Sequence, residues 1–95
     1  MAAHVGVLTI ELALYEAASL KDKRRVLKSL KDRMRAQFNA AVAEVDNQDA
    51  RQRATLAVAM VSADPRHLHS HLDQAVDFVR TCGGASLVGY EKEVL

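Results

Sequence analysis

Basic side chains recur at helical spacing in the first half of the chain, and they have the clearest potential chemistry. Residues 21–35 contain eight Lys and Arg against two Asp, a net charge of +6 in a chain whose formal net charge is +1. At 100° per residue of an α-helix, five of these cations fall within about 80° of one face. Such a stripe can neutralise the phosphates of a nucleic-acid backbone. With the adjacent Arg25, the predicted nucleic-acid-binding residues are Lys21, Arg24, Arg25, Lys28, Lys31 and Arg35.

Two interpretations of this stripe remain open. It can be a solvated face, because Lys and Arg keep a helix soluble and their stems cover apolar surface. Alternatively it meets an anionic partner such as RNA. Like charges three or four residues apart, such as Arg24 and Lys28, repel by about 0.2–0.5 kcal/mol per pair, and a helix that needed only solubility would intersperse glutamates. The spacing therefore gives an anionic partner as much support as the solvated face.

Histidines give a weaker signal. His67 and His71 lie four residues apart around His69 at the start of a predicted helix, the spacing at which two histidines can share a metal. Zinc takes three or four protein ligands, and no nearby cysteine or HExxH pattern supplies the others. We therefore expect a partly exposed helical turn, with no metal and no other cofactor.

No set of residues suggests catalysis. Glu44, Asp46 and Asp49 form an acidic group, but aspartates between two strands more often hold the amides of a turn. Cys82 follows a predicted helix, whose negative C-terminal end disfavours a thiolate. The sequence favours a binding protein, without an identified small-molecule substrate, over an enzyme.

Six predicted elements position these residues. Residues 4–14 alternate with the period of two that is typical of a strand. Ser19 and Asp22 resemble a capping box, and residues 40–45 and 52–62 are two strand-like runs around a polar turn. Between the first strand and residues 40–45, apolar residues recur at helical spacing at Leu20, Leu27, Leu30, Met34 and Phe38.

The second half of the chain repeats the order of helix and strand. Asp64 and Pro65 are an N-cap and a first-turn proline, and the helical pattern stops at Gly83 and Gly84. Residues 87–94 are rich in strand-forming residues. Two strand-helix-strand units divided by a hairpin predict an α+β fold, the ferredoxin-like β-α-β-β-α-β sandwich with a four-stranded antiparallel sheet and two helices on one face. We expect one such domain over residues 1–95, with a core that contains Leu8, Ile10, Leu30, Leu56, Val58 and Leu72.

The other face of this sheet should be open. It would present Val5, Val7, Thr9 and Glu11 beside Arg53, Thr55, Ala57 and Ala59. The RNA-recognition motif, which shares this fold, stacks bases on aromatic residues of that face, and none is predicted there. Phe38 and Phe78 belong to helix faces, which leaves Tyr15 and Tyr90 as the plausible stacking residues. We therefore expect contacts with structured RNA through phosphates, or with a protein assembled on RNA, over sequence-specific reading of single strands.

Composition points to a cytoplasmic protein. Cys82 is the only cysteine, so it has no intramolecular disulfide partner. No apolar run approaches the roughly 18 residues of a membrane span, and the N-terminus lacks the basic region of a signal peptide.

Four blocks of this chain resemble the bacterial YlxP-like family, domain of unknown function 503. They are SLKDKRRVLKSL from Ser19, FNAAVAEVDNQD from Phe38, QRATLAVAMVS from Gln52 and YEKEVL from Tyr90. The resemblance implies a ferredoxin-like fold in a protein often encoded among translation and ribosome-maturation genes. The chain departs from the family pattern at Ala50 and Arg51, where relatives often carry leucine and tryptophan.

Three hypotheses for function follow. The basic stripe favours an RNA-binding or ribosome-associated protein. The mildly apolar open face favours a homodimer or another protein-interaction module. An enzyme has only the acidic turn and the histidine run in its support.

Overall fold

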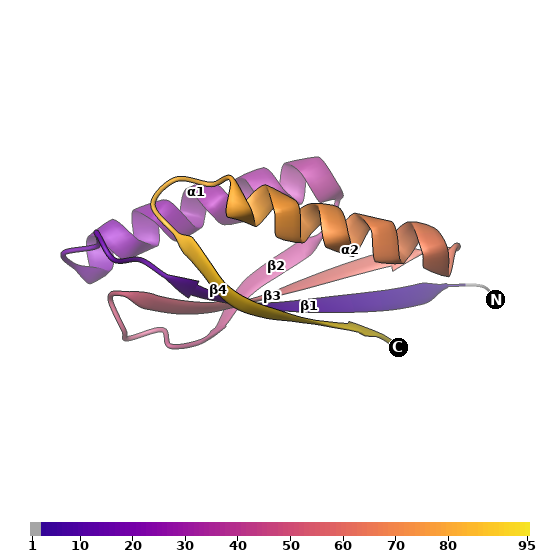
Figure 1. Ribbon diagram of the computed structural model, residues 1–95, viewed down its shortest axis with the longest axis horizontal. Helices are drawn as coiled ribbons and strands as arrows, with labels where there is room; N and C mark the ends of the chain where they lie inside the picture. The colour runs from indigo at the N-terminus through magenta and orange to yellow at the C-terminus, as the bar shows by residue number, and fades with distance from the viewer. Residues whose placement is uncertain (1–2) are drawn as a thin grey trace.

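The computed structural model describes residues 3–95, and its elements follow the predicted order (Figure 1). The strands and helices are β1 (His4–Ala13), α1 (Leu20–Phe38), β2 (Ala41–Asp46), β3 (Arg53–Ser62), α2 (Pro65–Arg80) and β4 (Ser86–Val94). Each end of each strand lies within one residue of its predicted position. Alternation, apolar runs around a polar turn and strand-forming composition were therefore sufficient signals for the four strands.

The strands form one antiparallel sheet in the order β2-β3-β1-β4. β1 is central and pairs with β3 and with β4. Both helices cover the same face, and the opposite face is open (Figure 1). This arrangement confirms the predicted ferredoxin-like fold.

Local hydrogen bonds fix the helix ends. Ser19 Oγ accepts a hydrogen bond from the Asp22 amide at 3.1 Å, and the Asp22 carboxylate accepts one from the Ala18 amide at 3.1 Å, which is the predicted capping box. At α2, Asp64 caps the first turn through the Arg66 amide at 2.9 Å. The end of α2 differs from the prediction, because Thr81 caps it in a right-handed conformation and the positive φ of +85° comes later, at Gly84.

One core lies between the helices and the sheet. The six predicted core residues all belong to it, and each is at most 2% exposed. Phe38 and Phe78 meet edge to face at 5.7 Å between ring centroids, so both aromatic side chains belong to the core or its rim, as predicted.

Gly6 brings α2 close to the central strand. A Cβ atom at this position would lie 2.8 Å from Leu72 Cδ1 and 3.2 Å from Leu68 Cγ. A side chain would therefore have to displace two buried leucines of α2.

Candidate nucleic-acid interface

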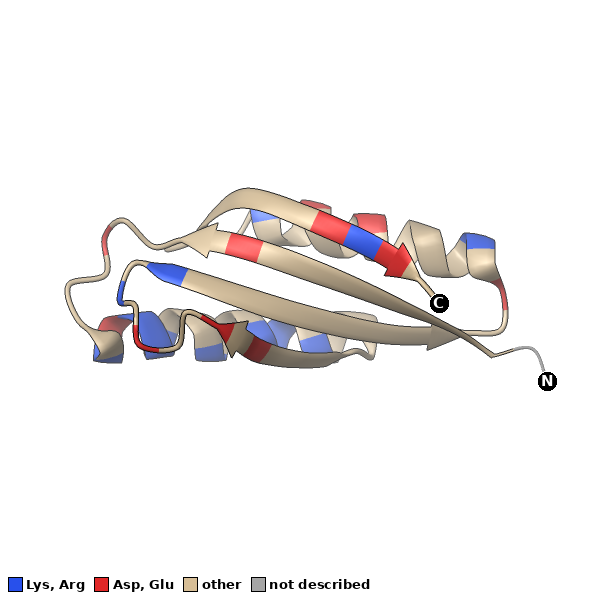
Figure 2. Ribbon diagram, turned by 90° about the horizontal axis from the view of Figure 1, so that it is seen from below, with Lys and Arg blue, Asp and Glu red and all other residues tan. Residues whose placement is uncertain are grey.

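The predicted basic residues lie along the outer side of α1. Lys21, Arg24, Arg25, Lys28 and Arg35 are exposed and Lys31 is partly buried. At a rise of 1.5 Å per residue, the stretch from the first to the last is about 21 Å long. Figure 2 shows these blue bands along the length of the helix.

An acidic residue neutralises part of the C-terminal half of this surface. Lys28 Nζ lies 2.8 Å from Asp32 Oδ2, and Arg35 Nη1 lies 3.4 Å from Asp32 Oδ1. Arg35 Nη2 also donates to the Val42 carbonyl at 2.6 Å. The hydrogen bond from Lys28 is the main cause that lowers the pKa of Asp32, and the charges of Lys28, Arg35 and Lys31 add to it. Asp32 therefore stays ionised, and two of the six cations are already engaged.

The N-terminal half of α1 carries three free and exposed cations. Within residues 3–95, Lys21, Arg24 and Arg25 form no ion pair. Their side chains are exposed to solvent. This half of the helix is therefore the part best able to contact phosphates.

The β2–β3 hairpin carries two arginines that the sequence reasoning did not assign to this surface. Arg51 lies in the hairpin loop and Arg53 begins β3, and both are exposed. Figure 2 shows the loop at the same end of the molecule as the beginning of α1. The basic surface thus extends from the helix onto the hairpin loop with Arg51, whereas Arg53 lies on the open face, as strand alternation predicts.

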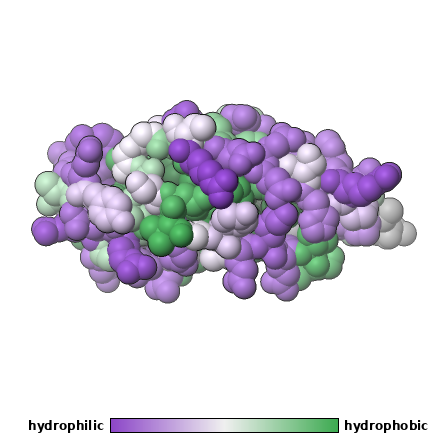
Figure 3. Space-filling model, viewed as in Figure 1, coloured by the Kyte–Doolittle hydropathy of each residue, from purple (hydrophilic) through white to green (hydrophobic). Residues whose placement is uncertain are grey.

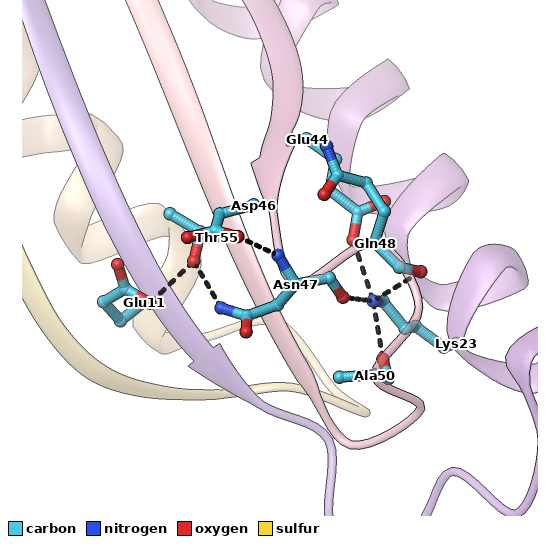
Figure 4. A network of polar contacts seen from close by, with 8 residues as sticks. All are labelled: Glu11, Lys23, Glu44, Asp46, Asn47, Gln48, Ala50 and Thr55. Atoms are coloured by element: carbon cyan, nitrogen blue, oxygen red, sulfur yellow. Dashed lines mark hydrogen bonds and ion pairs between the residues drawn. The ribbon is translucent and has the colours of Figure 1, made fainter.

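Lys23 holds the hairpin loop against α1 (Figure 4). Its side chain is 1% exposed, and its Nζ donates to the carbonyls of Asn47 at 2.6 Å, Ala50 at 2.7 Å and Gln48 at 3.4 Å. An ammonium group has three protons, and three carbonyls accept them here. Glu44 Oε2, at 2.8 Å from Nζ, is buried without a hydrogen bond, so the ion pair alone compensates its charge.

A second set of hydrogen bonds, made with side chains of the sheet, holds the same loop. Asn47 Nδ2 donates to Thr55 Oγ1 at 2.9 Å, and Thr55 Oγ1 donates to Glu11 Oε2 at 2.8 Å (Figure 4). These neighbours bury Thr55, which the strand pattern had placed on the open face. Asp46 accepts the Asn47 amide at 2.7 Å, the turn role predicted for it.

Lys23 lies beneath this surface, and sequence reasoning missed its supporting role. It precedes Leu27, Leu30 and Met34 by four, seven and eleven residues, so it occupies the apolar stripe of α1 and not the basic one. A single lysine in an apolar stripe was the signal that could have identified it.

The open sheet face differs from the helical face in charge. Glu11, Glu91 and Glu93 are the red bands on β1 and β4 in Figure 2. Toward β2, the face is apolar, with a hollow of about 230 Å³ beside Ala41, Ala43, Ala57 and Ala59. A phosphate backbone would meet these three carboxylates beside Arg53 on this side, and the cations of α1 on the other side.

The remaining predicted residues lie apart from the basic surface. The rings of His67 and His71 are tilted by 48° with centroids 4.0 Å apart, and residues 3–95 contain no group of three His, Cys, Asp or Glu side chains placed to hold a metal. Cys82 is buried, and its Sγ donates to the Phe78 carbonyl at 3.4 Å. Neither helix is long and apolar enough to cross a membrane in the part of the chain that the structure describes.

The two tyrosines differ in their surroundings. Tyr90 is 45% exposed, and the Arg80 guanidinium lies 5.8 Å from its ring centroid. It lines a hollow of about 650 Å³ along β4, with Arg80 and residues 85–89, where Figure 3 shows exposed hydrophobic surface among hydrophilic residues. Tyr15 is 74% exposed and lies at the end of the sheet that carries the hairpin loop.

Comparison with known proteins identifies the family. The family model described as "Protein of unknown function (DUF503)" matches residues 5–92. The chain belongs to this family. The DUF503 relative "Uncharacterized protein YlxP" of Bacillus subtilis (strain 168) is 33% identical over 75 residues, which is 79% of this chain and 82% of that protein. The resemblance inferred from the four sequence blocks is thus confirmed.

A solved structure shares the fold of this DUF503 chain. The de novo designed protein Foldit4 is similar with a TM-score of 0.57 and 11% sequence identity, over 97% of this chain and 96% of that one. At this identity the likeness concerns the fold alone.

Proposed function

We propose that this protein is a non-catalytic, cytoplasmic protein that binds structured RNA, such as that of a ribosomal particle, through the N-terminal half of α1 and the hairpin loop. One observation carries the proposal: the exposed cations Lys21, Arg24 and Arg25 have no carboxylate partner within residues 3–95. Phosphate oxygens would supply that partner.

Two further features support RNA as the polyanion. The strand registers place Glu11, Glu91 and Glu93 on the open face, so the helical side is the better surface for phosphates. The gene context implied by the family resemblance favours a partner in translation, and contacts to phosphate and sugar suit structured RNA, which is recognised mainly by shape.

A salt titration of RNA binding tests the proposal. Log affinity should fall with log salt concentration, by about 0.7 to 0.9 per neutralised phosphate. Lys21→Glu combined with Arg24→Glu should reduce this slope by roughly two such contacts. Both substitutions place an acid near the start of a helix, which favours the fold, so a loss of binding would not come from unfolding.

Arg66→Glu is the matched control for Arg24→Glu. Arg66 is 93% exposed in the first turn of α2, and its replacement changes the net charge by the same amount. Arg24→Glu should weaken binding and Arg66→Glu should leave it within about twofold, a change of roughly 0.4 kcal/mol. Equal effects of the two substitutions, or wild-type protein that binds no RNA, would refute the proposal.

The apolar part of the open face favours a second candidate function, a homodimeric interaction module. Ala41 and Ala43 are exposed, and Val61 is 68% exposed. Self-association through apolar surface persists in high salt, whereas phosphate binding weakens. A dimer mass in high-salt sedimentation that Ala57→Glu converts to a monomer mass would support this candidate, and a monomer mass for the wild type would exclude it.

A further inference from the structure

Tyr15 is an exposed aromatic side chain on a fixed backbone. Its side chain is 74% exposed, yet its carbonyl accepts a hydrogen bond from Gln52 Nε2 at 3.1 Å. The preceding Leu14 amide donates to the Gln52 carbonyl at 2.9 Å, and the Ala17 amide donates to the Leu14 carbonyl at 3.1 Å. The ring is therefore presented to solvent from a loop whose backbone is already held in place.

Tyr15 also lines a hollow. It measures about 290 Å³, and its lining includes Tyr15, Glu16, Gly84, Ala85 and Ser86. Pockets for small ligands typically measure about 300–1,000 Å³, so this one suits a single flat group and not a whole nucleotide chain.

The chemistry of the lining favours a nucleobase over a phosphate. Tyr15 offers an aromatic face on which a base can stack. Glu16 is the only carboxylate among the described residues that line the hollow, and it repels phosphate while it can accept a hydrogen bond from the amino group of adenine, cytosine or guanine.

Cations lie on the two segments that flank Tyr15. The Leu14 amide donates to the Gln52 carbonyl and the Tyr15 carbonyl accepts from the Gln52 side chain, so the hairpin loop with Arg51 runs next to Tyr15. On its other side, the short loop after Tyr15 leads directly into α1 and to Lys21. A base stacked on Tyr15 would thus have cations on two sides for its flanking phosphates.

We propose that Tyr15 and the adjacent hollow bind one unpaired base of the RNA, such as a bulged nucleotide, while the cations of α1 and the hairpin hold the backbone on either side. This inference rests on the proposed function, because the base belongs to the same RNA. It narrows the ligand to structured RNA that presents an unpaired base. Stacking tolerates different bases, so the site selects for an unpaired position and not for a sequence.

The test compares two RNAs that differ in one nucleotide. The probes are a blunt duplex of about 16 base pairs, the span of a typical double-stranded-RNA domain, and the same duplex with one bulged adenosine. Wild-type protein should prefer the bulged duplex by about 5-fold to 150-fold, which corresponds to the 1–3 kcal/mol of a base–aromatic stack. Tyr15→Ala should bind both duplexes equally with an unchanged salt slope, and Tyr15→Phe should keep the preference.

A spectroscopic signature locates the contact. The chain has two tyrosines, so in Tyr90→Phe protein that contains 3-fluorotyrosine, Tyr15 gives the single fluorine resonance. The ring current of a stacked base should shift this resonance with the bulged duplex and not with the blunt duplex. Circular dichroism checks that each variant is folded, which we expect because the substituted rings are exposed.

The outcomes separate this inference from the proposed function. Salt-dependent binding that Lys21→Glu and Arg24→Glu weaken, but with equal affinity for the two duplexes and no fluorine shift, would overturn the base site and leave RNA binding in place. Wild-type protein that binds neither duplex would overturn both. A preference for the bulge that disappears in Tyr15→Ala, together with the shift, would establish the site.

Discussion

Lys23 places an ammonium group where the pattern of α1 would otherwise put an apolar side chain. A buried charge is expensive to desolvate, and here three carbonyls and Glu44 compensate it. These contacts fix the position of the hairpin loop, which contains Arg51, relative to α1. The basic surface on two elements is therefore held together by a residue that is not part of that surface.

Lys23→Met should destabilise the fold strongly. The substitution removes the donor of three carbonyls and the counter-charge of the partly buried Glu44 carboxylate, and breaking a buried pair from one side typically costs about 3–5 kcal/mol. Urea denaturation measures the change in the free energy of unfolding. Lys21→Met, two residues earlier and exposed, is the control and should stay within about 0.5 kcal/mol of wild type. A loss below about 1 kcal/mol in Lys23→Met would show that the loop does not depend on this lysine.

At the level of single residues, the sequence predicted the basic surface only in part. The six residues of α1 were found because cations repeat at helical spacing on a face away from the apolar stripe. Arg51 was not assigned to it, because its proximity to α1 depends on how the hairpin folds back, which no local spacing encodes. The pairing of Asp32 with Lys28 and Arg35 could have been predicted, because these residues lie four and three positions apart on one helix.

At the level of elements, the contact between α2 and β1 depends on Gly6. The two leucines above it, Leu68 and Leu72, are at most 1% exposed, so they have little room to move. Close approach of a helix to a sheet requires a small residue at the point of contact. Gly6 serves this purpose on the strand that pairs with two neighbours.

Gly6→Ala should destabilise the protein, whereas Gly89→Ala should not. The added methyl at Gly6 would lie 2.8 Å from Leu72 Cδ1, and overpacking of a core typically costs about 1–3 kcal/mol. At Gly89, in β4, an added Cβ meets nothing within 4 Å. Thermal or urea unfolding of the two variants is the measurement. Equal stabilities would mean that α2 moves away without a penalty.

The elements were the most predictable part of the structure. Period-two alternation located the strands, and the side-chain caps at Ser19 and Asp64 located both helix starts. The end of α2 was less accurate, because Gly83 and Gly84 indicated a left-handed cap. The helix instead closes at Thr81, whose amide and hydroxyl bond to the Phe78 carbonyl.

The whole molecule separates charge between its two faces. The formal net charge is only +1, yet the cations of α1 and the carboxylates of β1 and β4 lie on opposite layers (Figure 2). At physiological ionic strength, exposed charges farther apart than about 8 Å are largely screened. The local charge of α1, and not the net charge, should therefore govern binding to a polyanion.

Glu91→Lys combined with Glu93→Lys tests this separation. The two substitutions raise the formal net charge from +1 to +5, but they act on the open face. RNA affinity at physiological salt should stay within about threefold of wild type, a difference of roughly 0.7 kcal/mol. Fluorescence anisotropy with a labelled duplex gives the affinity. An increase of tenfold or more would indicate that net charge or the open face controls binding.

The position of β1 at the centre of the sheet also has a kinetic consequence. Its two neighbours come from the second half of the chain, and the register joins Gly6 to Met60 on one side and to Val94 on the other. Contacts between residues so distant in sequence form slowly, because a long loop must close before they add stability. On a ribosome that is still synthesising this protein, β1 cannot pair with β4 until β4 has been made. The sheet therefore becomes complete only when translation of the domain has ended.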